Sequence, residues 1–133
     1  MITKIINKLY EYSNCYIEII TDDKLEIPAF SFIEEDLYGR IKPMIVLNSK
    51  LFPKEENVLA HILAHEWGHH ALKHVFTNPK NLSSKELEAK EDEADEYASK
   101  FIKEYMYDTN PIIDYFKRHS PNYNERINIL LSK

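Results

Sequence analysis

The sequence predicts an α+β fold built as a single domain over residues 1–133. Short β-prone runs are confined to the first third of the chain, and helical periodicity dominates the rest. A chain of 133 residues has the size of one domain and can bury roughly two-thirds of its unfolded surface. Its composition, 44% hydrophobic and 29% charged, is typical of a globular protein and excludes a disordered or fibrous chain.

The first third is expected to form a helix followed by a small twisted sheet. Apolar residues at positions 2, 5, 6 and 9 recur at helical spacing. Three β-prone runs follow, CYIEIIT, AFSFI and MIVL, separated by the polar segments TDDKLEIP and EEDLYGRIKP. If the MIVL run borders a cleft, we expect it to pair with an extended peptide by strand addition.

Four helices are expected in the remainder. The segment ENVLAHILAHEWGHHALKHVF is the strongest of them, because Pro53 and acidic residues precede it and an Asn-Pro pair follows. Ser83 and Glu86 have the spacing of a capping box and open a second helix that reaches about residue 107. The patterns IIDYFKRH and NYNERINILL predict two shorter C-terminal helices.

Charge and cysteine content exclude several classes of function. Seventeen Lys and Arg stand against 22 Asp and Glu, so the net charge of −5 supplies no positive field for direct nucleic-acid binding. No apolar run approaches the eighteen or so residues that cross a bilayer, so we expect no membrane partner. The single Cys15 cannot form an internal disulfide, and the N-terminal stretch does not have the unbroken apolar run of a signal peptide. We therefore expect a cytoplasmic protein.

A dense histidine cluster carries the chemistry of the chain. Five of the six histidines fall between His61 and His74, and within them lies the H-E-x-x-H motif at residues 65–69. At about 100° per residue, His65 and His69 lie on one helical face and can reach a single zinc ion. Glu66 falls beside the open coordination position, where a carboxylate can take a proton from a water molecule that the metal activates.

A catalytic zinc site with two histidines needs a third protein ligand, and the second long helix offers Glu91. Glu91 falls in the middle of an apolar stripe on that helix, whereas Glu93 points the opposite way. Burying an unpaired glutamate costs several kcal/mol, so a cation is expected to meet it. Asp95, one turn later, is expected to accept the remaining ring N–H of a zinc-bound histidine. The stripe comprises Leu87, Ala94, Ala98, Phe101, Ile102 and Tyr105.

Simpler interpretations apply to the neighbouring residues. An ion-pair network between the two helices, with no metal, is the alternative to the metal site. His61 shares the face of the motif; it is a further ligand candidate, but we expect it to pack in the core or to support a ligand. His70 and His74 are expected on the far face as surface or core-edge residues. Trp67 is expected to be a packing residue, and Cys15 a buried structural thiol.

At these residues the chain resembles the gluzincin metallopeptidases, in which a glutamate on a later helix completes H-E-x-x-H. The stretch IVLNSKLFPKEENVLAHILAHEWGHHALKH, followed by EDEADEYASKFI, resembles the ImmA/IrrE-like family. The same block, the histidine nine places after the first of the motif and the tail SPNYNERINIL are similar to HtpX/Ste24-like peptidases and their single-domain minigluzincin relatives. The resemblance implies a zincin-like fold with one catalytic zinc on His65, His69 and Glu91, with Glu66 as general base and Asp95 supporting a ligand.

The C-terminal part departs from that pattern. In the HtpX/Ste24-like tail a His-Pro pair precedes an arginine, whereas here the order is His119-Ser120-Pro121 and then Arg126, one residue out of step. His119 and Arg126 are therefore only candidates for donors that stabilise the transition state. The membrane helices of those enzymes are absent from this sequence. The ImmA/IrrE-like resemblance implies cleavage of a helix-turn-helix transcriptional repressor, by analogy.

These observations predict a cytoplasmic zinc metalloendopeptidase that hydrolyses peptide bonds of a protein substrate. One alternative is a non-hydrolytic zinc-binding module that recognises a partner protein in the same cleft, because such a module needs the ligands but not Glu66. Another is a structural zinc protein with a closed four-ligand site that includes His61.

Overall fold

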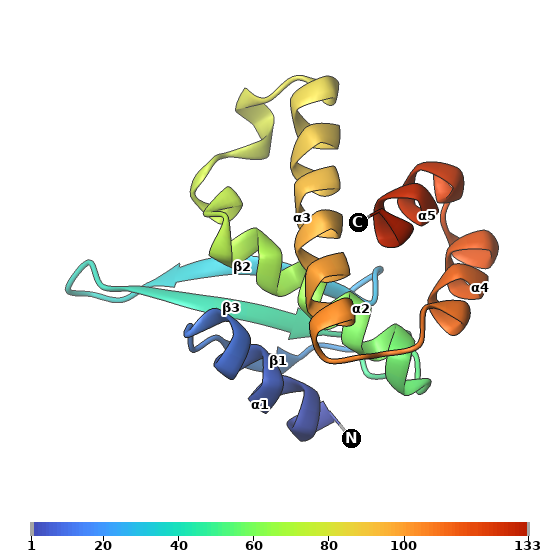
Figure 1. Cartoon of the computed structure of the whole chain (residues 1–133). Helices are drawn as coiled ribbons and strands as arrows, with labels where there is room; N and C mark the ends of the chain where they lie inside the picture. The colour runs from blue at the N-terminus through green and yellow to red at the C-terminus, as the bar shows by residue number, and fades with distance from the viewer. Residues whose placement is uncertain (1, 133) are drawn as a thin grey trace.

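The computed structural model describes residues 2–132 and confirms the expected α+β order of an N-terminal helix, a small sheet, two long helices and C-terminal helices (Figure 1). The N-terminal helix and the sheet occupy the first third of the chain. Two short 3₁₀ turns, η1 and η2, join the long helices. The elements are α1 Ile2–Ser13, β1 Glu18–Thr21, β2 Ala29–Glu35, β3 Ile41–Leu47, α2 Glu56–Ala71, η1 His74–Phe76, η2 Pro79–Asn81, α3 Ser84–Glu104, α4 Thr109–His119 and α5 Tyr123–Leu131.

The sheet has the order β1-β3-β2, with β1 parallel and β2 antiparallel to β3. The MIVL run is thus the central strand, and our expectation that it would pair with a peptide is wrong, because β1 and β2 already use both of its edges. Ile45 faces the core between Ile19 and Ser31 in register. The strand with an unpaired edge next to the helices is β2.

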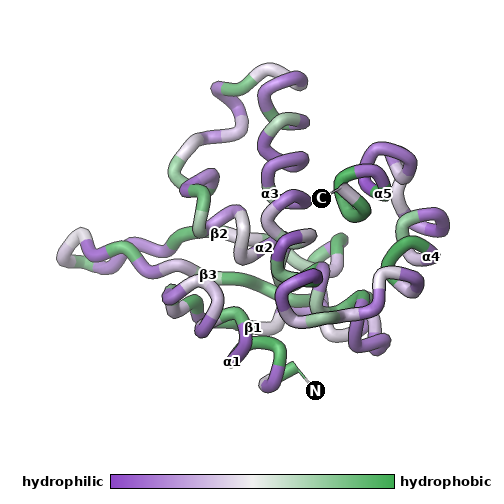
Figure 2. Tube along the Cα trace, viewed as in Figure 1, coloured by the Kyte–Doolittle hydropathy of each residue, from purple (hydrophilic) through white to green (hydrophobic). Residues whose placement is uncertain are grey.

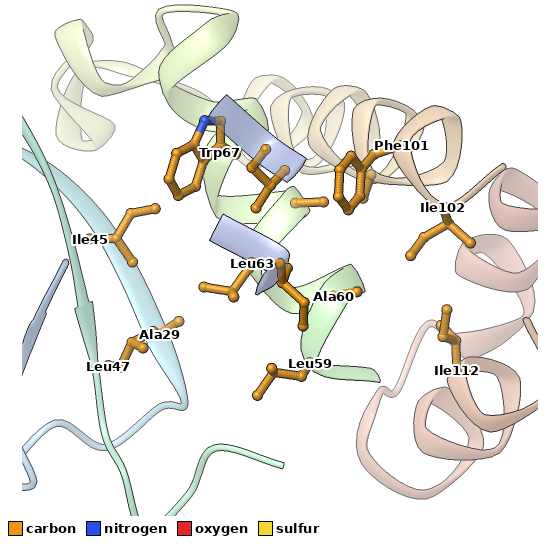
Figure 3. Close-up of a cluster of buried hydrophobic side chains, with 14 of the residues drawn as sticks. Ala29, Ile45, Leu47, Leu59, Ala60, Leu63, Trp67, Phe101, Ile102 and Ile112 are labelled. Atoms are coloured by element: carbon orange, nitrogen blue, oxygen red, sulfur yellow. The ribbon is translucent and has the colours of Figure 1, made fainter. Parts of the chain in front are cut away.

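The core lies between the sheet, α2 and α3. Figure 3 shows the side chains of α2, among them Leu63 and Trp67, between Ile45 on β3 and Phe101 on α3. Trp67 is fully buried, as expected of a packing residue, and its Nε1–H donates to Ser13 Oγ at 2.9 Å. Burying the largest side chain of α2 in this way fixes which face of the helix turns away from the sheet.

Helix α2 and helix α3 approach closely at Gly68. A Cβ atom on Gly68 would lie 3.0 Å from Tyr97 Cβ, so only glycine fits here without displacing α3. The predicted capping box is present at the start of α3, where Ser83 and Glu86 each accept the backbone N–H of the other.

Helix α2 is shorter than predicted. It ends at Ala71, and Lys73 adopts a left-handed conformation with φ of 63°. The next residues form η1, and the chain then turns away from the direction of α2 toward the start of α3 (Figure 1). Our placement of His74 on a far face of a continuous helix is wrong, because the helix stops before it.

Hydropathy follows this layout. In Figure 2 the central strand is largely hydrophobic, whereas α3 is hydrophilic along much of its length. Between residues 2 and 132, none of the helices combines the length and the apolar character that a membrane span requires.

Candidate metal centre

Three potential ligand atoms converge where α2 crosses α3. His65 Nε2 lies 2.8 Å from Glu91 Oε2 and 3.2 Å from His69 Nε2, and His69 Nε2 lies 3.5 Å from Glu91 Oε2. Ligands about 2.0–2.1 Å from a tetrahedral zinc ion are separated by about 3.3 Å. The spacing of the three atoms therefore fits one zinc ion.

Two helices supply these atoms. His65 and His69 lie one turn apart on α2, with their ring centroids 4.8 Å apart. Glu91 reaches them from α3 because the two helices are in contact at Gly68 and Tyr97. The expected burial of Glu91 is wrong: 59% of its side chain is exposed, because the first turns of α3 border an open cleft.

Carboxylates make this point favourable for positive charge. Burial lowers the pKa of His65, but hydrogen bonds to Asp95 and Glu91 outweigh it and raise that pKa to about 10. The hydrogen bonds from His65 and His69 hold the pKa of Glu91 well below its usual range. A site that binds a proton so tightly also attracts a divalent cation, since the cation occupies the same lone pairs.

Asp95 orients His65 from behind. Its Oδ1 lies 2.8 Å from His65 Nδ1, the contact that the predicted support of a histidine ligand requires. Burial raises the pKa of Asp95, but the hydrogen bonds from His65 and Arg126 outweigh it and lower the pKa below its usual range. An ionised Asp95 accepts the Nδ1 proton, so Nε2, which faces Glu91 and His69, is the nitrogen that would give up its proton to bind a metal ion.

Arg126 holds Asp95 in place through hydrogen bonds. Its Nε and Nη2 donate to the two oxygens of Asp95 at 2.8 and 3.0 Å, and Nη1 donates to Ser120 Oγ at 2.8 Å. The guanidinium also lies 4.1 Å from the centroid of the Phe116 ring. Arg126 thereby ties α5 to the centre.

Glu66 lies next to the converging atoms and contacts the sheet. Ser31 Oγ on β2 is 2.7 Å from Glu66 Oε1 and 3.0 Å from the backbone oxygen of Glu66. Burial raises the pKa of Glu66, and the neighbouring His65 and His69 oppose that shift. No sequence pattern marks Ser31, because a serine in a strand has many roles and the contact between β2 and α2 is long-range.

The centre opens into a cleft of about 1270 Å³. Strand β2 forms one wall, residues 50–54 and α2 border it, and α4 lines the far side. His119 lies on that side with its ring centroid 4.4 Å from that of Tyr115, and no hydrogen bond between described residues joins it to the centre. Apolar lining residues include Phe30, Phe32, Phe52, Ile62 and Leu87.

The other histidines of α2 lie outside the set of converging atoms. His61 is buried, as expected of a packed residue, with its ring edge-on to Phe116 at 5.0 Å. Burial lowers the pKa of His61 to about 3. Of the surface and core-edge positions expected for His70, its 7% exposure excludes the surface, and its Nε2–H donates to Met44 O at 2.8 Å. Cys15 is a free, half-buried thiol packed against the core.

Among residues 2–132, one further group has metal-ligand spacing: Glu88, Asp92 and Glu125, which contains no histidine. The group of His65, His69 and Glu91 is the one that opens into the cleft. A closed four-ligand site with His61 does not fit this arrangement, because its ring packs on Phe116.

Comparison with known families adds one finding. The family model described as Peptidase U49 matches residues 57–127, more than half of the chain. The match begins in α2 and ends in α5, so it contains both histidines of the motif, Glu91 and Asp95. It supports a peptidase and does not bear on the gluzincin or ImmA/IrrE-like resemblance. No curated protein and no solved structure matches the chain.

Proposed function

Because the chain belongs to the peptidase U49 family, we propose that this peptidase is a zinc metalloendopeptidase whose ion is held by His65, His69 and Glu91. The observation that carries the proposal is the convergence of His65 Nε2, His69 Nε2 and Glu91 Oε2 within 3.5 Å of one another. Two imidazoles and one carboxylate are a usual ligand set for catalytic zinc, with the fourth position left to water.

A bound zinc ion would act as a Lewis acid that lowers the pKa of a water molecule and polarises the substrate carbonyl. Glu66 is the general base. Its Oε1 accepts the Ser31 hydroxyl, which leaves Oε2 to take the proton of the attacking water. The water oxygen adds to the carbonyl carbon, and Glu66 returns the proton to the amine nitrogen as the C–N bond breaks.

The donor that stabilises the oxyanion comes from the α4 side of the cleft in this proposal. His119 and Tyr115 line that side. Arg126 also lines the cleft, but its Nε and both Nη nitrogens already donate to Asp95 and Ser120. We therefore favour His119 over Arg126 as the donor.

The proposed substrate is an extended protein segment that adds to the unpaired edge of β2. Strand β2 lines the cleft and lies antiparallel to β3, so its second edge offers backbone N–H and C=O groups beside Glu66. Phe30, Phe32 and Ile62 make the adjoining lining apolar, which favours apolar substrate side chains. The ImmA/IrrE-like resemblance makes helix-turn-helix repressors the first natural substrates to assay.

The test compares wild type with Glu66→Gln. We expect the purified wild type to contain one zinc ion per chain and to cleave an unfolded protein such as casein, with new termini found by mass spectrometry. The Glu66→Gln variant should retain the zinc and lose cleavage, because the amide cannot accept the proton. Equal cleavage by both proteins would refute the mechanism. Zinc without cleavage of casein or of repressors would favour the non-hydrolytic binding module.

A further inference from the structure

Each histidine of the centre has a partner on the ring nitrogen that faces away from the other ligand atoms. For His65 this partner is Asp95. For His69 it is His74, whose Nδ1 lies 3.0 Å from His69 Nδ1, with the ring centroids 5.2 Å apart. No spacing pattern in the sequence predicts this contact, because it depends on the turn after α2.

The two Nδ1 atoms can share one hydrogen bond only if one of them carries the proton and the other has a lone pair. His74 Nε2 lies 3.7 Å from Glu93 Oε1, so the carboxylate favours the tautomer of His74 with its proton on Nε2. His74 Nδ1 is then the acceptor, and His69 Nδ1–H donates to it. With Nδ1 fixed as the donor to His74, the Nε2 atom of His69, which points toward His65 and Glu91, is the nitrogen that would bind the metal ion.

We propose that His74 is a positioning residue for the zinc ligand His69, holding its ring orientation and tautomer through the Nδ1–Nδ1 hydrogen bond. The inference rests on the proposed function, since it presumes that His69 binds zinc. An outward hydrogen-bond acceptor fixes a ligand imidazole and makes its other nitrogen more basic.

The backbone conformation just before His74 places its side chain against α2. Lys73, the residue after the C-cap of α2, adopts a left-handed conformation with φ of 63°, as residues at the end of an α-helix often do. The turn of η1 that follows brings His74 back against α2 and leaves it 9% exposed. This left-handed residue ends α2 and turns the chain so that the buried His74 ring meets His69.

Zinc affinity provides the test, measured by competition with a chromophoric chelator on the full chain. His74→Leu keeps the bulk and removes the acceptor, so we expect zinc binding to weaken by about 10–100-fold. His74→Asn places Oδ1 near the position of Nδ1, and we expect it to bind zinc within about threefold of wild type, about 0.65 kcal/mol. His70→Leu is the matched control, a buried histidine of α2 whose bond goes to Met44 O, and it should also bind within about threefold, about 0.65 kcal/mol.

Co²⁺ loaded in place of zinc gives a second measurement, because its visible absorption bands report ligand geometry directly. We expect the bands to shift in His74→Leu and to match wild type in His74→Asn. If the leucine variant does not fold, His74→Gln replaces it, because the glutamine amide reaches the Nε2 position rather than that of Nδ1.

Two results would overturn the inference. Wild-type zinc affinity in His74→Leu, or in its glutamine substitute, would show that the hydrogen bond does not matter. Equal weakening in the asparagine and leucine variants would show that His74 acts only by packing. Failure of wild type itself to bind zinc would instead refute the proposed function, so the two failures are distinguishable.

Discussion

His61 and His65 lie one turn apart on the same face of α2, yet their surroundings are opposite. His61 packs edge-on against Phe116, and burial lowers its pKa to about 3. His65 lies between Asp95 and Glu91, which raise its pKa to about 10 against the effect of burial. Helix α4 supplies the Phe116 ring against His61, and helix α3 supplies the carboxylates against His65. Segments distant in sequence therefore decide whether a histidine stays neutral or attracts a cation.

The largest effect should come from removing the carboxylate that distinguishes the two histidines. In Asp95→Ala, Arg126 loses both of its bonds to Asp95 and His65 loses its Nδ1 acceptor. Breaking such a buried pair costs about 3–5 kcal/mol of the free energy of unfolding. Urea denaturation measures this loss, and chelator competition should show weaker zinc binding as well. An unchanged denaturation midpoint would mean that Asp95 does not organise the centre.

Lowering the pH should reveal the neutral state of His61 as a loss of stability. His61 has a folded pKa of about 3 against an unfolded value of 6.5, so its neutral form stabilises the fold above pH 6.5. That stability is lost as pH falls from 6.5 towards 3, at about 1.4 kcal/mol per pH unit, or about 3 kcal/mol by pH 4.5. Urea titrations of wild type and His61→Phe between pH 7 and 4.5 measure the difference. Identical slopes in the two proteins would refute the assignment.

For His65, in protein stripped of metal by a chelator, stability should change with pH in the opposite direction. Its folded pKa of about 10 exceeds the unfolded value of 6.5, so the stability that it contributes is complete below pH 6.5. That contribution is lost as pH rises from 6.5 towards 10. The measurement is the same urea titration carried into alkaline pH, with His65→Phe as the comparison.

A smaller effect is expected from moving α3 away from α2. In Gly68→Ala the new methyl group would lie 3.0 Å from Tyr97 Cβ, which forces the helices apart by a few tenths of an ångström. Overpacking of this kind costs about 1–3 kcal/mol. Because Glu91 is carried by α3, zinc binding should weaken while the environment of His61 is unchanged. Thermal unfolding and chelator competition measure the two effects, and wild-type values in both would contradict the close approach.

The smallest effect should follow from Ser31→Ala, which removes the hydroxyl next to Glu66 Oε1. We expect the rate of casein cleavage to fall about tenfold, equivalent to about 1.4 kcal/mol, because the base loses one orienting hydrogen bond. Zinc content should not change. Ser31→Thr, which keeps a hydroxyl, is the control, and equal loss in both variants would argue against the hydrogen bond.

Local patterns predicted much of this molecule. The order of elements follows from helical and strand periodicity, and the capping box at Ser83 follows from short-range hydrogen bonding. The juxtaposition of His65, His69 and Glu91 was predicted from helical spacing and an apolar stripe, although Glu91 faces an open cleft rather than the core.

Features that depend on contacts between distant segments could not be predicted from local sequence patterns. The central place of β3 depends on how β1 and β2 pair with it, and no pattern within the MIVL run encodes that order. His74 looked like one more residue of α2, because nothing in the sequence marks the left-handed turn at Lys73. The contact of Ser31 with Glu66 joins residues 35 positions apart.

Anomalous diffraction at the zinc absorption edge, from crystals of the zinc-loaded protein, tests the central claim most directly. We predict one strong peak at about 2.0–2.2 Å from His65 Nε2, His69 Nε2 and Glu91 Oε2, with a water molecule as the fourth ligand. A peak at another place in the molecule, or Glu91 turned away from both imidazoles, would contradict the account.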